Sequence, residues 1–179
     1  MVFQRPANLF GMRFERQRPI IPGTKFVYLA EGAHGVILAD TSKGRVRKIF
    51  FSQPSESGRP SARMFCSEVR AYEIAMMRPR LQGLVPKFFG RCPTGTILDE
   101  HGINISDEFV PGLAFEAEMI NLAFVKIGTI DANERKRVVD LFAGEGISYL
   151  EDASVAMDGN LVVKVIDFAI EGFEVQHLD

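Results

Sequence analysis

Residues 25–51 read KFVYLAEGAHGVILADTSKGRVRKIFF, and three short runs in this stretch, at 25–29, 35–39 and 46–51, are rich in β-branched and aromatic residues. The turns between these runs contain glycine. Runs of this kind, separated by glycine-containing turns, are typical of strands that pair with their neighbours along the chain. We therefore predict a meander of three antiparallel strands here.

A helix is predicted after the meander. Apolar residues recur at helical spacing over residues 62–78, at Phe65, Val69, Tyr72 and Met76. The helix should end before Pro79, because the residue that precedes a proline is disfavoured in helical conformation. Shorter strand-like runs follow around residues 87–89, 96–98 and 109–110.

The last third of the chain predicts a second helix and a hairpin. Asp131-Ala-Asn-Glu134 resembles the capping box that begins a helix, and this helix should end near Gly144. Residues 155–157 and 161–166 flank an Asp-Gly-Asn turn and predict a hairpin. The order of strands, helix, strands, helix and hairpin predicts an α+β fold in two layers.

The composition excludes several classes of protein. The 179 residues are 46% hydrophobic and 25% charged, as in an ordinary globular chain of one domain or two small lobes. The two cysteines have no zinc-site spacing and are too few for a disulfide framework. No apolar run approaches the roughly 18 residues of a membrane helix, and the N-terminus has no signal-type apolar region. We therefore expect no membrane segment and no metal ribbon.

The charge is divided unevenly along the chain. Residues 1–98 hold sixteen Lys and Arg against six Asp and Glu, a net of +10, whereas residues 99–179 hold five against seventeen, a net of −12. Two oppositely charged lobes facing a cleft would place phosphates toward one lobe and metal-binding carboxylates on the other. Solvated faces or self-complementary packing are the ordinary alternatives. We expect no nucleic-acid partner, because the acidic half would repel a polyanion.

Two features of the meander suggest phosphate chemistry. The first is the turn Glu31-Gly32-Ala33-His34-Gly35-Val36, because glycines let backbone N–H groups approach phosphates. The second is Lys48, which lies inside an apolar strand, where lysine is rare unless it is paired. Each also has an ordinary interpretation, as a hairpin turn and as an edge-strand lysine with a solvated ammonium.

Three carboxylates complete the candidate site. Glu68 flanks the apolar stripe of the predicted helix and is the proposed partner of Lys48, with Glu73 as the alternative. Asp167 directly follows an apolar strand, where a carboxylate can coordinate Mg²⁺, and Asp152 precedes it by fifteen residues. Taken singly, each aspartate is also explained as a turn or cap residue.

In this order the features resemble the protein-kinase signature: glycine-rich loop, strand lysine, helix glutamate, catalytic-loop aspartate and strand-end Asp-Phe. The resemblance extends over about residues 25–170 and implies a minimal two-lobed protein-kinase-like fold. It implies an irregular N-terminal arm (1–22), an N-lobe with an antiparallel sheet and one helix (23–110), and a much reduced C-lobe (111–179). Residues 108–112, Glu-Phe-Val-Pro-Gly, look like the hinge between the lobes.

The resemblance implies roles for these residues with ATP and Mg²⁺. Lys48, held by Glu68, would contact the α- and β-phosphates, Asp167 would hold Mg²⁺, and Asp152 would accept the proton of a serine hydroxyl. Further ATP contacts would come from the loop and the hinge, at Gly32, Ala33, His34, Gly35, Val36, Glu108 and Val110. Val36 or Ile37, Leu161 and Ile166 are the candidate apolar walls for adenine.

The sequence also departs from the kinase pattern. Ala30 replaces the first loop glycine, Leu150-Glu151 precedes the catalytic aspartate, and Ala169 ends the Asp-Phe motif. Met157 stands where the second metal ligand is usually found, which leaves Ser154 and Asn160 as candidates. Only twelve residues follow Asp167, so we expect neither a full activation segment nor the usual helical C-lobe.

This reduced size resembles the HopBF-type effector kinases that bacteria inject into eukaryotic cells. The resemblance implies a monomeric serine kinase that acts in the host cytoplasm and inactivates the ninety-kilodalton heat-shock chaperone by phosphorylation. A catalytically inactive kinase-like binding module is the first alternative, because the motifs are degraded. A phosphotransferase for a small molecule is the second.

Overall fold

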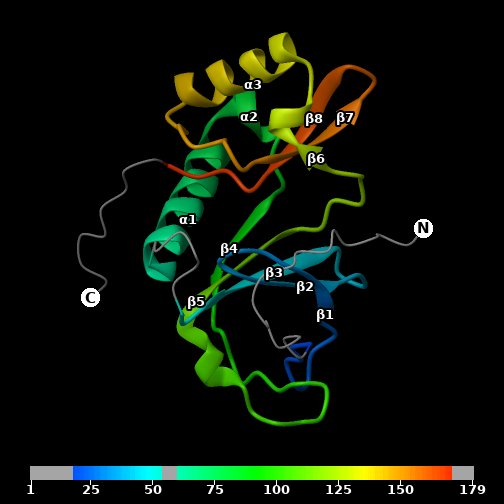
Figure 1. The fold of residues 1–179 in the computed structure, drawn as a ribbon, viewed down its shortest axis with the longest axis vertical. Helices are drawn as coiled ribbons and strands as arrows, with labels where there is room; N and C mark the ends of the chain where they lie inside the picture. The colour runs from blue at the N-terminus through cyan, green and yellow to red at the C-terminus, as the bar shows by residue number, and fades with distance from the viewer. Residues whose placement is uncertain (1–17, 54–59, 171–179) are drawn as a thin grey trace, which may run out of the picture.

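A five-stranded antiparallel sheet forms one half of the computed structural model, which describes residues 18–53 and 60–170 (Figure 1). Its strands follow the order β1-β2-β3-β5-β4, with neighbours hydrogen-bonded. Their bounds are Val27–Glu31 for β1, Gly35–Asp40 for β2, Arg45–Phe51 for β3, Phe88–Cys92 for β4 and Phe109–Glu118 for β5. The predicted meander is therefore confirmed as β1, β2 and β3.

A smaller three-stranded sheet lies at the other end of the molecule (Figure 1). It comprises β6 (Val125–Lys126), β7 (Ser154–Asp158) and β8 (Leu161–Ile166), paired in the order β6-β7-β8. Two helices, α1 (Ser61–Met77) and α2 (Pro79–Gln82), precede β4, and α3 (Ala132–Gly144) precedes β7. Short 3₁₀ turns occupy Ser106–Glu108 and Ile127–Thr129. The predicted α+β class, both long helices and the final hairpin are confirmed.

Helix α1 joins the two halves through one apolar core. The ring centre of Tyr72 in α1 lies 4.7 Å from that of Phe168, which follows β8. It lies 5.6 Å from the ring centre of Phe115 in β5. Phe142 of α3 contacts Phe168 at 5.5 Å, ring centre to ring centre. Because α1 packs against the large sheet and against Phe168, it fixes the segment that follows β8 relative to that sheet, which matters for the site described below.

A second core covers the outer face of the large sheet. Ile21 and Phe26, which precede β1, and Ile97, which precedes β5, are buried with Val36 and Ile49 of the sheet. The strand predicted at 96–98 forms only isolated bridges, from Leu98 to Ile20 and to Asn104. Residues 1–17 of the predicted N-terminal arm lie outside the described residues.

The boundary predicted after residue 110 falls inside a strand. Residues 109–118 form β5, which pairs with β3 on one side and β4 on the other. The two-residue strand predicted around Phe109 and Val110 therefore underestimates β5. Residues 119–124 make the connection from the large sheet to β6, so this part of the chain joins the two halves.

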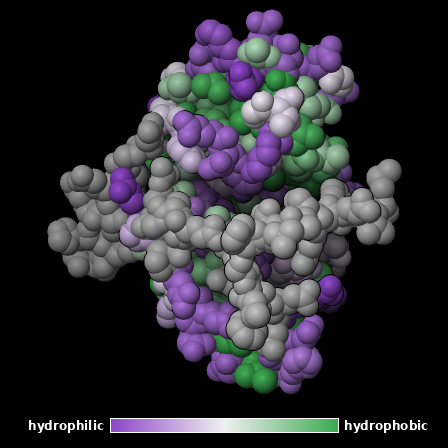
Figure 2. Space-filling view, in the orientation of Figure 1, coloured by the Kyte–Doolittle hydropathy of each residue, from purple (hydrophilic) through white to green (hydrophobic). Residues whose placement is uncertain are grey.

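The N-terminus of α3 is anchored by two carboxylates. Asp131 caps the helix by accepting hydrogen bonds from the backbone N–H groups of Asn133 (2.9 Å) and Glu134 (3.1 Å). The Glu134 side chain does not complete the predicted capping box; it accepts from the Val162 N–H (2.7 Å) and from Arg137. The outward side of α3 is hydrophilic (Figure 2).

We expect Glu134→Ala to lower the free energy of unfolding by about 1.5–3 kcal/mol at pH 7, because the buried Val162 N–H loses a charged acceptor. The hydrogen bonds from Arg137 hold the pKa of Glu134 at about 2, below its ordinary 4.5. A depressed pKa stabilises the fold above pH 4.5, and this contribution is lost as the pH falls toward 2.

Urea unfolding of wild type and variant between pH 7 and pH 2 measures this difference. Asp140→Ala is the matched control on the same helix, because Asp140 makes an exposed ion pair with Lys136. We expect this control to change stability by less than about 1 kcal/mol. If Glu134→Ala lowered the free energy of unfolding by the same amount at pH 7 and at pH 2, the stabilising role assigned to the ionised Glu134 carboxylate would be contradicted.

Candidate functional site

Lys48 of β3 carries a buried ammonium that is paired with Glu68 of α1. The Lys48 Nζ donates to both carboxylate oxygens of Glu68 at 2.7 Å, and the side chains are 14% and 8% exposed. The register of the sheet explains the approach, since Lys48 is paired with Ile37 and Phe115, and Phe115 packs against α1. The pairing predicted from the sequence is confirmed, and the alternative Glu73 instead contacts Arg70.

Lys48 remains charged in this environment. Burial alone would lower the pKa of Lys48, but the carboxylates of Glu68 and Asp167 raise it above its ordinary value. Burial raises the pKa of Glu68, against the opposing effect of the Lys48 ammonium. Lys48 therefore keeps a positively charged ammonium, which Glu68 holds in place beside Asp167.

Asp167 lies beside this pair. Its Oδ1 is 4.0 Å from Nζ of Lys48, and its side chain remains 39% exposed. Asp167 is the only non-glycine residue with a positive φ (60°) within residues 18–53 and 60–170. Residues held in this conformation are strained and often lie at functional sites, and they persist only where the surrounding structure holds them in place. Here the neighbouring Phe168 is fully buried in the core and provides that anchor.

The segment after Asp167 is fastened to α1. Ser67 donates a hydrogen bond from Oγ to the Ile170 carbonyl (2.6 Å) and accepts one from the Ile170 N–H (3.0 Å). Ser67 directly precedes Glu68, so one turn of α1 positions the partner of Lys48 and also the chain that follows Asp167. No sequence pattern indicated this role for Ser67.

Asp152 is brought to the same region by backbone pairing. Tyr149 and Ala169 exchange two backbone hydrogen bonds, of 3.0 and 2.9 Å, which place the turn carrying Asp152 beside the segment carrying Asp167. The Tyr149 hydroxyl donates to Oδ2 of Asp152 at 2.7 Å, and Lys126 donates to the Asp152 carbonyl at 2.7 Å. The carboxylate is thus oriented while Asp152 itself stays exposed. Sequence analysis missed Tyr149 and Lys126.

The hairpin separates the two candidates for a second metal ligand. Ser154 of β7 is paired with Ile166, the residue before Asp167, whereas Asn160 lies in the turn at the opposite end of the hairpin. Ser154 therefore stays a candidate, and Asn160 does not. No cluster of three or more His, Cys, Asp or Glu suited to a metal occurs in the described parts of the chain. Any cation here would be held by Asp167, the Ser154 hydroxyl and oxygens of a bound ligand.

The predicted hinge at residues 108–112 is wrong. Glu108 is exposed in a 3₁₀ turn and its carbonyl accepts from the Ser52 N–H (2.8 Å), while the Val110 carbonyl accepts from the Thr94 hydroxyl (3.1 Å). Glu108 directly precedes β5 and Val110 is its second residue, whereas the connection to the smaller sheet begins after the other end of β5, at Glu118. The sequence Glu118-Met119-Ile120 has the same acidic-apolar-apolar pattern as Glu108-Phe109-Val110.

The glycine turn separates its residues between the two faces of the sheet. Val36 is 2% exposed and its side chain belongs to the outer core, so of the two predicted candidates for an adenine wall, Val36 and Ile37, Val36 is excluded. Ile37, which pairs with Lys48, lies on the correct face. Gly32, Ala33 and His34 connect β1 to β2; the first two are exposed and His34 is half-buried.

Gly35 is required by packing against the next strand. A Cβ at this position would lie 2.1 Å from the carbonyl oxygen of Ile49, whereas a Cβ at Gly32 would meet only the Gly35 oxygen, at 3.8 Å. We expect Gly35→Ala to lower the free energy of unfolding by about 1–3 kcal/mol, because the strands must separate. Gly32→Ala should change it by less than about 0.5 kcal/mol. Thermal unfolding of both variants measures the contrast, and equal stability of the two would contradict it.

The described contacts assemble one ammonium and two accessible carboxylates at the junction of the sheets. An ammonium fixed by Glu68 suits a phosphate oxygen, Asp167 suits a divalent cation, and Asp152 suits a proton acceptor. Comparisons of the chain with models of protein families, with curated proteins and with solved structures found no match. Within the described residues, no helix has the length and apolar character needed to cross a membrane.

Proposed function

We propose that this chain is an ATP-dependent protein serine kinase with a minimal two-lobed protein-kinase-like fold. The observation that carries the proposal is the Lys48–Glu68 pair, with Nζ of Lys48 4.0 Å from Oδ1 of Asp167. Asp167 directly follows β8 and has a positive φ. Phosphoryl transfer asks a protein mainly for positioning and charge stabilisation, which these groups can provide. In this proposal the five-stranded sheet with α1 is the N-lobe, and α3 with the smaller sheet is the reduced C-lobe.

Each residue then has one task. Lys48 holds the α- and β-phosphates of ATP, and Glu68 keeps its ammonium in place. Asp152, oriented by Tyr149, takes the proton of the attacking serine hydroxyl as the serine oxygen bonds to the γ-phosphorus. The bond from that phosphorus to the bridging oxygen breaks, and ADP leaves with its electron pair. Glu118–Ile120 takes the place of Glu108 and Val110 as the segment beside adenine.

Asp167 would hold Mg²⁺, with Ser154 as a further oxygen ligand. The exposed fraction of the Asp167 carboxylate and its distance of 4.0 Å from Lys48 fit a cation held next to phosphates. Bound Mg²⁺ neutralises charge on the phosphates. The protein's own part is to fix the carboxylate through the buried Phe168 and the Ser67–Ile170 hydrogen bonds.

The resemblance to HopBF-type effectors extends the proposal to a substrate and a place of action. We infer that a bacterium delivers the kinase to the host cytoplasm and that it phosphorylates a serine of the ninety-kilodalton heat-shock chaperone. This part rests on the resemblance of the motifs and their spacing. It is independent of the geometry that supports ATP chemistry.

The test is phosphoryl transfer from γ-labelled ATP with Mg²⁺ in a eukaryotic cell lysate. We expect one strongly labelled protein with wild type and none with Asp167→Asn. Asp158→Asn is the matched control, because Asp158 is an exposed aspartate at the far end of the same hairpin. If the labelled protein is not the heat-shock chaperone, the inferred substrate is wrong. No label with wild type, while ATP still binds, would favour a kinase-like binding module instead.

A further inference from the structure

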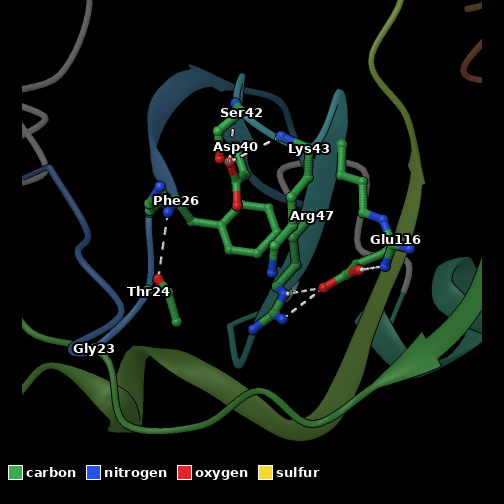
Figure 3. A pocket seen from close by; sticks show the side chains of 10 residues that line it. Gly23, Thr24, Phe26, Asp40, Ser42, Lys43, Arg47 and Glu116 are labelled. Atoms are coloured by element: carbon green, nitrogen blue, oxygen red, sulfur yellow. Dashed lines mark hydrogen bonds and ion pairs between the residues drawn. The ribbon is translucent and has the colours of Figure 1, made fainter.

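A cavity of about 380 Å³ lies on the outer face of the large sheet, and Figure 3 shows the residues that line it. Arg45, Arg47 and Glu116 line it, and these residues alternate along β3 and β5 with Val46, Lys48 and Phe115, which face α1. Residues 23–26 and the turn from β2 to β3 complete its wall. The cavity is therefore separate from the candidate kinase site.

Four cationic side chains surround this cavity and two carboxylates neutralise part of their charge. The cations are Lys25, Lys43, Arg45 and Arg47, and the carboxylates are Asp40 and Glu116. Hydrogen bonds from Ser42 and Lys43 lower the pKa of Asp40. Burial alone would raise the pKa of Glu116, but hydrogen bonds from Arg47 and Arg45 lower it below its ordinary value. Both carboxylates are ionised at neutral pH, so the lining carries a net charge of +2.

The carboxylates are already engaged within the wall. Asp40 Oδ1 accepts from the Ser42 hydroxyl (2.6 Å) and from the Ser42 and Lys43 N–H groups (3.1 and 3.2 Å). Glu116 accepts from Arg47 at 2.6 and 3.1 Å and from Arg45 at 3.0 Å. In the part of the chain that the structure describes, no carboxylate lies within 4.0 Å of the ammonium of Lys25 or Lys43. These two ammonium groups therefore keep their donors for a ligand.

The two guanidinium groups are held in place before any ligand arrives. Arg47 lies over the buried ring of Phe26, with its Cζ 4.6 Å from the ring centre, and Arg45 lies over Phe89 at 4.1 Å. Figure 3 shows the Phe26 ring between the Asp40 turn and the Arg47–Glu116 pair. Fixed guanidinium groups with unused N–H donors bind oxyanions at a low cost in side-chain entropy.

We propose that this cavity binds a phosphate group, carried either by a small phosphorylated compound or by a phosphorylated side chain. A lining of net charge +2 complements a dianion, and phosphate oxygens accept several charge-assisted hydrogen bonds at once. A cavity of about 380 Å³ is larger than the phosphate itself, which leaves room for the group to which the phosphate is attached.

The experiment is calorimetric titration of the full chain with inorganic phosphate. We expect saturable binding that weakens at least about tenfold in Lys25→Gln/Lys43→Gln, because two charge-assisted hydrogen bonds are lost. Both lysines are exposed, so the fold should be unaffected. Lys136→Gln, an exposed lysine of α3, is the matched control and should bind phosphate like wild type.

A parallel titration of Lys48→Met/Glu68→Leu separates this cavity from the candidate kinase site. Phosphate binding that survives in this variant and is lost in Lys25→Gln/Lys43→Gln supports the proposal. Binding that is lost with Lys48, or that is equal in the wild type and the double lysine variant, overturns it. Absence of saturable phosphate binding overturns it as well.

The source of the phosphate is identified with a pair of peptides that differ only in the phosphorylation of one serine. Tighter binding of the phosphoserine peptide than of inorganic phosphate assigns the cavity to a phosphorylated side chain. Equal affinity of the two assigns it to a small phosphorylated compound. Equal binding of both peptides would show that phosphate is not recognised and would contradict the proposal.

Discussion

Replacing Asp152 by Asn is expected to lower the rate of phosphoryl transfer by about 10²- to 10⁴-fold, the usual contribution of a positioned proton acceptor. Binding of ATP should be retained, because Lys48 and Asp167 are unchanged. The amide keeps the shape of the side chain and can still accept the hydrogen bond from Tyr149, so the loss reports the proton acceptor. Single-turnover transfer from γ-labelled ATP measures the rate. A rate within a factor of about three of wild type would exclude Asp152 as the proton acceptor, since loss of such an acceptor lowers the rate by about 10²- to 10⁴-fold.

Tyr149→Phe provides the companion variant, because it removes the hydrogen bond to Oδ2 of Asp152 and keeps the aromatic ring. We expect kcat to fall by about tenfold or more, with KM for ATP unchanged. In the Tyr149→Phe/Asp152→Asn double variant the two losses should not multiply, because both changes act on the same carboxylate. Multiplying losses would show that Tyr149 acts on activity by another route.

Replacing Lys48 by Met is expected to destabilise the fold by about 3–5 kcal/mol, because the buried Glu68 loses its only ion-pair partner among the described residues. Adding Glu68→Leu should restore stability to about that of wild type, since a buried ion pair can often be exchanged for apolar side chains without loss. Both variants should be inactive. Urea unfolding and the transfer assay together measure this separation of stability from activity.

Arg70→Met is the control for the Lys48 series, because Arg70 makes an exposed ion pair with Glu73 on the same helix. Its effect should stay below about 1 kcal/mol. If the double variant Lys48→Met/Glu68→Leu were as stable as wild type and also fully active, the Lys48–Glu68 pair would be a structural feature only. The kinase proposal would then lose its main support.

The sequence predicted the Lys48–Glu68 pair because both signals are local. A lysine inside an apolar strand requires a partner, and the helical period placed Glu68 on the flank of the buried stripe. The strands β1, β2 and β3 were predicted for a similar reason, since adjacent strands and their turns depend on neighbouring residues.

The hinge was misplaced because its position depends on the length of β5. Pro111 and Gly112 resemble the end of a strand, and Gly112 has a φ of 76°. Pairing nevertheless continues to Glu118 with β3 and to Ala117 with β4, and no local pattern reveals the pairing of β3 with β5, whose contacts join residues 69 and 71 positions apart. The same limit hid the charged outer face, because the contact of Glu116 with Arg45 and Arg47 follows from the register between β3 and β5.

The role of Tyr149 could not be predicted from the sequence either. Its hydroxyl donates to Asp152 within the same turn, but this turn lies beside the segment that carries Asp167 because the backbone of Tyr149 pairs with Ala169, after β8 has returned the chain. The weak signal that was present is the spacing of three residues between a tyrosine and an aspartate ahead of a strand. Such a spacing is common and does not by itself indicate a functional contact.

The central claim is that Lys48 and Asp167 form a site for Mg²⁺ and ATP, and calorimetric titration of the purified chain with ATP in the presence of Mg²⁺ tests it most directly. The account predicts saturable binding to wild type that weakens by at least about tenfold in Lys48→Met/Glu68→Leu. It also predicts that Asp167→Asn removes the dependence of binding on Mg²⁺. ATP affinity that is the same in wild type and in both variants would contradict the account.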